Sequence, residues 1–179
     1  MNIEQNLDLI RPLTWKEVFD LWQQGEAHQQ AWIEHYKRHG FGSWAEWRSS
    51  HIEPLGLANL NWNLHQILNP AATVPQFLGG PFKGWIDKYY PNGQAITFGQ
   101  LAKNLEFRNH DRVLAIMNGF PAETTITAVR TAAGIVVVEG MHRCLALSLM
   151  AQRNAAPKTT MMLALADYEG ELPIVGKGD

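Results

Sequence analysis

The residues that decide the fold read IVVVEGMHRCLAL, from Ile135 to Leu147. Four consecutive β-branched residues predict a strand that is buried on both faces. Gly140 then predicts a sharp turn, and the stretch from His142 to Gln152 predicts a helix that is apolar on almost every side. The sequence therefore predicts a strand, a glycine turn and a helix in direct succession.

The segments on either side of this unit predict further strands. Thr124 to Arg130 is rich in Thr, Ile and Val, and the turn at residues 132–134 joins it to the apolar run, which is typical of a β-hairpin. Thr159 to Ala166 predicts one more strand, packed against the helix. We expect an α+β fold with a small mixed sheet.

The glycine turn predicts a site for an anion. The backbone amides of Met141, His142 and Arg143 come first in the helix, so they lack intrahelical acceptors and attract phosphate. The Arg143 guanidinium suits two phosphate oxygens, and His142 adds a donor when it is suitably protonated. Glu139, just before Gly140, can accept a substrate proton or hold a metal ion through water, or else it is a surface carboxylate that caps the turn.

Residues 136–147 resemble the strand-turn-helix box of the ParB/sulfiredoxin superfamily, and the order of elements extends the resemblance over about residues 97–166. The resemblance implies a small α/β domain whose box binds nucleotide phosphates. Sulfiredoxins repair oxidised peroxiredoxins with ATP, ParB proteins bind and hydrolyse CTP on DNA, and some relatives are kinases of free serine. Met141 stands where sulfiredoxin chemistry needs cysteine, and only about a dozen residues follow Ala166, too few for the DNA-binding region of ParB. Both of these activities are therefore disfavoured.

Two functions remain open at this stage. The first is a phosphotransferase or nucleotide hydrolase that acts on a small molecule, with a nucleoside triphosphate and Mg²⁺ as cofactors and Glu139 as base. The alternative is a noncatalytic module that senses a nucleotide or a phosphorylated metabolite and contacts a protein partner through its N-terminal helices. Arg108 and Arg112, four residues apart, can reach a phosphate as well, or pair with acidic neighbours on a helix surface.

The N-terminal half differs in character, because all seven tryptophans lie before residue 93. Helices are predicted near residues 14–24, 27–38 and 43–52, and loop-rich structure from 55 to 93. Farther along, Thr97 and Asn109 are predicted to cap short helices. We expect residues 1–93 to form a helical and loop-rich extension that covers the α/β domain at 94–179 in one compact unit, with the tryptophans mostly in the core.

The composition of the chain argues against several classes of function. The 15 basic and 17 acidic side chains give a net charge of −2, which argues against nonspecific nucleic-acid binding. Cys144 is the single cysteine, so a reducing compartment is expected. No stretch approaches the roughly 20 apolar residues that span a bilayer, and we expect a cytoplasmic protein without membrane contact. His28, His35 and His39 fit a solvated helix face better than a metal site.

Overall fold

The computed structural model describes residues 3–176, and its centre is a mixed five-stranded sheet. The strands lie in the order β1-β2-β5-β3-β4. Their bounds are β1 (Leu7–Leu13), β2 (Trp62–Ile67), β3 (Glu123–Thr131), β4 (Gly134–Glu139) and β5 (Thr160–Asp167). Only β3 and β5 run parallel, and the other neighbours are antiparallel. The α+β class and the hairpin of β3 and β4 are confirmed.

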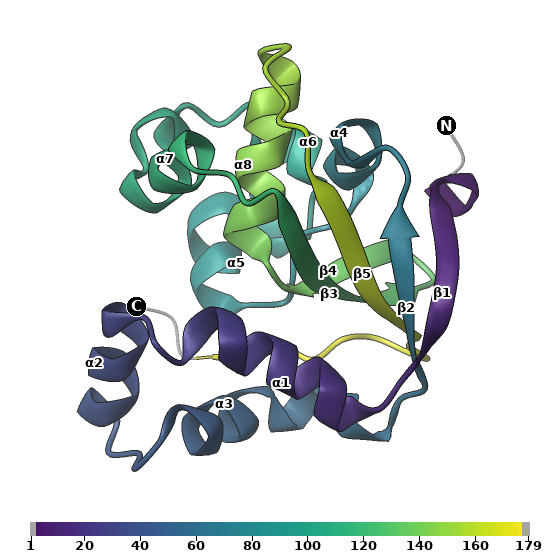
Figure 1. The fold of residues 1–179 in the computed structure, drawn as a ribbon. Helices are drawn as coiled ribbons and strands as arrows, with labels where there is room; N and C mark the ends of the chain where they lie inside the picture. Colours follow the sequence, from purple (N-terminus) through teal and green to yellow (C-terminus); the bar gives the residue numbers. More distant parts are fainter. Residues whose placement is uncertain (1–2, 177–179) are drawn as a thin grey trace.

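Helices cover both faces of this sheet (Figure 1). They are α1 (Trp15–Glu26), α2 (Gln30–Arg38), α3 (Trp44–Ile52), α4 (Pro70–Thr73), α5 (Lys83–Tyr89), α6 (Phe98–Leu101), α7 (Asp111–Asn118) and α8 (Met141–Gln152). Short 3-10 turns η1 to η6 lie at Ile3–Asn6, Glu53–Leu55, Leu57–Asn59, Val74–Gln76, Pro91–Gly93 and Leu105–Asn109. The N-terminal helices α1 to α3 lie below the sheet in Figure 1, and α5 to α8 lie above it.

Side chains that alternate along the inner strands fill the hydrophobic core on each face of the sheet. In β4, Ile135 and Val137 pack into the cluster that contains α8, whereas Val136 and Val138 pack into the tryptophan-rich cluster of the N-terminal helices. All four side chains are buried. Because successive side chains of a strand point to opposite faces, a continuous apolar run is what a strand covered on both faces requires. The predicted burial of this strand on both faces is confirmed.

Local signals placed several of the helix starts correctly. Thr14 and Glu17 form the capping box of α1, and the Ser43 hydroxyl accepts from the backbone of Glu46 at the start of α3. The prediction that Asn109 caps α7 is wrong, because Asn109 ends the turn η6 and His110 occupies the cap position. The predicted cap at Thr97 is correct, and its helix is a short one that ends at Leu101, before Asn104 caps the turn η6.

The description of residues 1–93 as helical and loop-rich was incomplete, because they also supply strands β1 and β2. Strand β2 lies between β1 and β5 in the sheet. Asn63, His65 and Gln66 interrupt its apolar pattern, and β1 exposes five of its seven residues and contains Pro12. Pairing of β2 with β5, and of β1 with β2, stabilises these strands more than their own propensity does. The N-terminal half is therefore part of the sheet and not only a cover on it.

Burial of the tryptophans in the core is confirmed for four of the seven. Trp22, Trp44, Trp47 and Trp62 are each at most 4% exposed. The indole nitrogen of Trp22 donates to the Thr127 hydroxyl of β3 at 2.7 Å, which fixes α1 on the lower face of the sheet.

Candidate functional site

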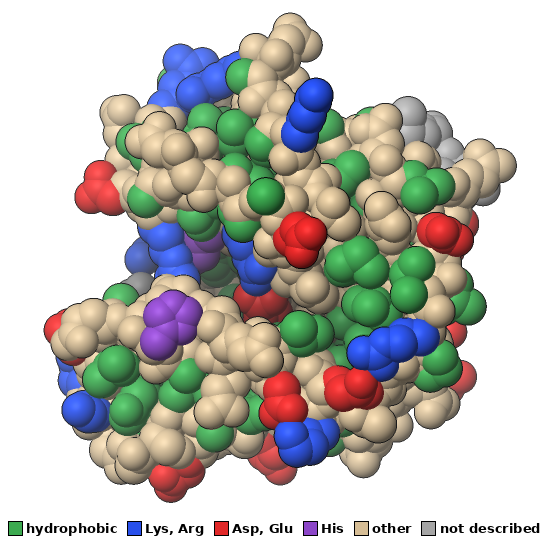
Figure 2. All heavy atoms as spheres, viewed as in Figure 1, with side chains coloured by type: hydrophobic (Ala, Val, Ile, Leu, Met, Phe, Trp, Pro, Cys, Tyr) green, Lys and Arg blue, Asp and Glu red, His purple; other side chains and the backbone are tan. Residues whose placement is uncertain are grey.

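A cleft of about 560 Å³ lies between the N-terminal helices and the layer of α5, α7 and α8. It is visible as the deep notch between the two lobes in Figure 2, with Lys or Arg and His side chains inside it. Its volume falls in the range of small-molecule sites, roughly 300–1,000 Å³. Residues 138–143 line it, so the strand-turn-helix unit predicted from sequence forms one of its walls.

Gly140 shapes the turn at the start of α8. Its φ is +96°, a left-handed conformation that glycine adopts without a steric penalty. A Cβ atom at this position would lie 2.6 Å from Cγ2 of Ile126. Both constraints require glycine, and they allow β4 to enter α8 directly with Glu139 beside the first helical turn.

The first turn of α8 offers unpaired amides to the cleft. The amide of Cys144 donates to the Gly140 carbonyl at 2.9 Å and begins the helical ladder. Among the described residues, the amides of Met141, His142 and Arg143 have no backbone or side-chain acceptor. All three residues line the cleft, as an anion site at a helix N-terminus requires.

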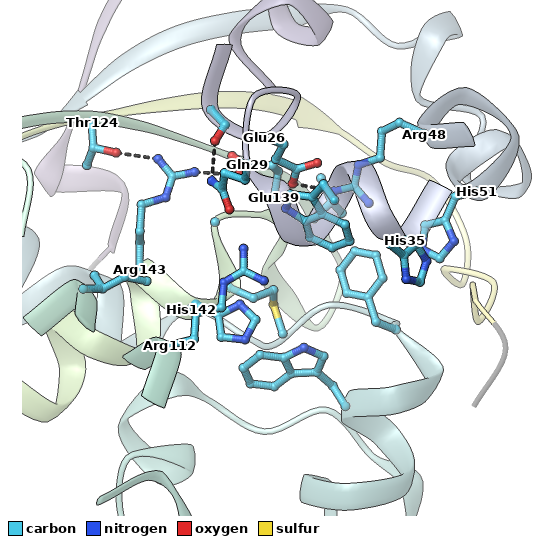
Figure 3. A pocket seen from close by; sticks show the side chains of 18 of the residues that line it. Glu26, Gln29, His35, Arg48, His51, Arg112, Thr124, Glu139, His142 and Arg143 are labelled. Carbon is cyan, nitrogen blue, oxygen red and sulfur yellow. Dashed lines mark hydrogen bonds and ion pairs between the residues drawn. The ribbon is translucent and has the colours of Figure 1, made fainter. Parts of the chain in front are cut away.

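The Arg143 guanidinium is engaged by protein acceptors (Figure 3). Its Nη1 donates to the Thr124 hydroxyl at 2.5 Å and to the Thr125 carbonyl at 2.9 Å, and its Nη2 donates to Glu139 Oε1 at 2.5 Å. The pKa of Arg143 is raised: burial opposes the charge, but the Glu139 carboxylate outweighs it. Arg143 therefore connects α8 to β3 and neutralises Glu139. These contacts lower the capacity of Arg143 to bind phosphate.

Arg112, on α7, is the guanidinium that remains available. Its guanidinium carbon lies 5.3 Å from the Trp32 ring centroid, and within the described chain it makes no hydrogen bond or ion pair. Burial lowers its pKa, while Glu26 and Glu139 oppose that shift. A partly desolvated cation without a carboxylate partner is a strong candidate to bind an anionic ligand. Arg108, by contrast, is exposed on η6 and lies outside the cleft, so the two arginines do not act together.

His142 is neutral at pH 7. Burial, reinforced by the charge of Arg112, lowers its pKa to about 3. Its ring packs edge-on against Trp85, with centroids 5.2 Å apart. At neutral pH the His142 imidazole therefore offers a neutral donor or acceptor, and its predicted role as a donor to phosphate stays a prediction.

The opposite wall comes from α1, α2 and α3, and sequence reasoning missed it as a site. Arg48 and Glu26 form an ion pair at 3.2 Å with both side chains at most 10% exposed. Glu26 also accepts from the indole nitrogen of Trp44 at 3.1 Å, and burial raises the pKa of this carboxyl. No spacing in the sequence marks these residues, because Glu26 and Arg48 are 22 positions apart and on different helices.

The three histidines considered as a metal site do not form one. His39 Nδ1 lies 2.8 Å from the His35 carbonyl, so this ring is bound to its own helix, and His28 is exposed outside the cleft. The described residues contain no cluster of three or more histidine, cysteine or acidic side chains that would hold a metal ion.

Comparison with known proteins gives no relatives: no family model, curated protein or solved structure matches the chain. Among residues 3–176, no helix is both long and apolar enough to cross a membrane.

Proposed function

We propose that the cleft binds a nucleotide or another small phosphorylated ligand, with its phosphate between the first turn of α8 and Arg112. The observation that carries this proposal is that three amides without acceptors and a guanidinium without an ion-pair partner, that of Arg112, line the same cleft. The helix dipole adds about 0.3–1 kcal/mol for an anion at this end. The resemblance of residues 136–147 to a phosphate-binding box supports the same assignment.

The cleft residues do not fit a Mg²⁺ site built by the protein alone. Its two carboxylates, Glu26 and Glu139, both face arginine partners. Mg²⁺ prefers octahedral oxygen ligands and usually enters with substrate phosphates. In this proposal Mg²⁺ would arrive with a nucleoside triphosphate and supply charge neutralisation for its phosphates, and Glu139 is the carboxylate of the α8 turn that could contribute to holding it.

Two versions of this function differ in the role of Glu139. In the first, the protein is a small-molecule phosphotransferase or nucleotide hydrolase, and Glu139 accepts the proton. In the second it is a sensor, and its N-terminal helices contact a protein partner. The ion pair with Arg143 favours the sensor, because Oε1 of the carboxylate already accepts from the guanidinium and is not free to take a substrate proton. In both versions we place the protein in the cytoplasm, where the single cysteine stays reduced.

The test is isothermal titration calorimetry of the full chain with the four nucleoside triphosphates, with and without Mg²⁺. We expect at least one to bind, and Arg112→Gln to weaken it ten- to a hundredfold, the effect of losing one charge-assisted contact. Arg108→Gln is the matched control, because Arg108 lies on the same side of the fold but outside the cleft. Equal losses in both variants, or none in Arg112→Gln, would refute the proposed phosphate position.

A further inference from the structure

A row of rings runs along the cleft from α2 and α3 to Phe82, the residue that precedes α5. Trp32 and Trp47 have centroids 5.1 Å apart, Trp47 and His51 are 5.4 Å apart, and His51 and Phe82 are 6.2 Å apart with nearly parallel planes. All four residues line the cleft, and Trp32, His51 and Phe82 are partly exposed. Such a row presents ring surface that begins at Trp32, beside Arg112, and extends away from the proposed phosphate position to Phe82.

His51 contributes to this row as an uncharged ring. Burial, together with the charges of Arg48 and His35, lowers its pKa to about 4. A neutral imidazole between aromatic neighbours behaves as one more flat surface on which a planar group can stack.

Arg48 supplies a polar group beside the row. It is 6% exposed, and its guanidinium lies over Trp22 and Trp47, 4.9 and 5.5 Å from their centroids. Its Nη2 donates to Glu26. Within the described chain, Nη1 and Nε have no acceptor, and of these two only Nε is fully enclosed by protein. Because Arg48 lines the cleft, the more open Nη1 is a donor that a ligand there can engage.

The charge of Arg48 decides what kind of acceptor suits it. The Glu26 carboxylate at 3.2 Å cancels most of its positive potential, so this end of the cleft does not attract a second anion. A neutral acceptor on the ligand, such as a carbonyl or a ring nitrogen, can accept from Nη1 without bringing a second negative charge beside Glu26.

We infer that the ligand carries a planar ring with a neutral hydrogen-bond acceptor on its edge, that the ring packs on the row from Trp32 to Phe82, and that Arg48 Nη1 donates to the acceptor. This inference rests on the proposed function, in which the phosphate of the same ligand binds between Arg112 and the first turn of α8. It assigns a second subsite to α2 and α3, which lie outside the segment that resembles a known family.

The experiment compares ligands that share the phosphates and differ in the ring. Inorganic triphosphate and the four nucleoside triphosphates are titrated into the full chain by calorimetry. We expect the best nucleotide to bind at least tenfold more tightly than inorganic triphosphate. Arg48→Lys keeps a cation for Glu26 but loses the planar donor, so it should weaken that nucleotide about tenfold and leave triphosphate unchanged. Arg108→Lys should change neither.

A second variant protects the test from misfolding. His51→Ala keeps the ion pair of Arg48 and shortens the row of rings, and it should reduce the nucleotide's advantage severalfold, whereas the exposed His28→Ala should not. Equal affinity for triphosphate and for every nucleotide would overturn the ring subsite while leaving phosphate binding at Arg112 intact. Loss of all binding, or indifference to Arg112→Gln, would instead refute the proposed function, and the ring subsite with it.

Discussion

Arg112 of α7 lies over the indole ring of Trp32 of α2, 5.3 Å from its centroid, and thereby joins the two walls of the cleft. A cation and an aromatic face attract each other by about 0.5–1 kcal/mol when exposed and by more when desolvated. The contact holds a guanidinium in the cleft without neutralising it. Trp32 also begins the row of rings, so one side chain serves both ends of the proposed ligand site.

Replacing Trp32 tests this double role. We expect Trp32→Leu to lower the free energy of unfolding by about 1–3 kcal/mol, because it removes a half-buried ring and its cation contact. It should also weaken a bound nucleotide more than inorganic triphosphate. Urea unfolding and calorimetry measure the two effects. Trp15→Leu, a partly buried tryptophan outside the cleft, is the control for ligand affinity, and equal ligand effects in both variants would contradict the role of Trp32.

The turn at Gly140 should not tolerate a side chain. Gly140→Ala places a Cβ atom in a left-handed conformation, 2.6 Å from Cγ2 of Ile126, and we expect it to lower the free energy of unfolding by about 2 kcal/mol or more. Gly84→Ala in α5 is the matched control, since no atom lies within 4 Å of its Cβ position and alanine favours a helix by about 0.5–1 kcal/mol. Similar denaturation midpoints for Gly140→Ala and the wild type would show that the turn is more adaptable than described.

Glu139→Gln separates the enzyme from the sensor. The substitution removes the carboxylate that pairs with Arg143, and we expect a loss of about 1–3 kcal/mol in stability and tighter anion binding, because Arg143 keeps its charge without a counter-ion. If Glu139 is a general base, phosphate release or transfer falls by about 10²–10⁴ as well. Assays of both proteins with candidate substrates decide: equal turnover eliminates the base role, and no turnover in the wild type favours the sensor.

Two neutral histidines predict how stability depends on pH. The pKa values of His142 and His51 are lowered in the fold to about 3 and about 4, against 6.5 in the unfolded chain. Between these values the unfolded state binds more protons, so the stabilisation is complete above pH 6.5 and is lost as the pH falls toward 4. From pH 7 to pH 5 we expect each histidine to cost about 1–2 kcal/mol.

Urea unfolding at the two pH values measures this loss. His142→Gln, which cannot titrate, should show a smaller loss between pH 7 and pH 5 than the wild type. His28→Ala, at an exposed position outside the cleft, should retain the full loss. A pH dependence that is the same in His142→Gln as in the wild type would contradict a buried neutral His142.

The sequence by itself determined those parts of the fold that depend on neighbouring residues. The capping box of Thr14 and Glu17 spans three positions, and the continuous succession from Ile135 to Gln152 specifies strand, turn and helix. Gly140 was identifiable because the turn must adopt a conformation that only glycine adopts readily. Local propensity and the period of apolar residues suffice for such elements.

Tertiary structure alone decided the remaining strands and the cleft. Strands β1 and β2 carry weak patterns and are stabilised by pairing, so the N-terminal half enters the sheet without a clear sequence signal. The prediction that Arg143 binds phosphate took no account of Thr124, 19 residues away, which accepts from its guanidinium, whereas Arg112 is available because α7 faces Trp32 across the cleft. The pairing of charges and the alignment of rings depend on contacts between residues that are distant in the chain. The spacing of these residues in the sequence does not predict those contacts.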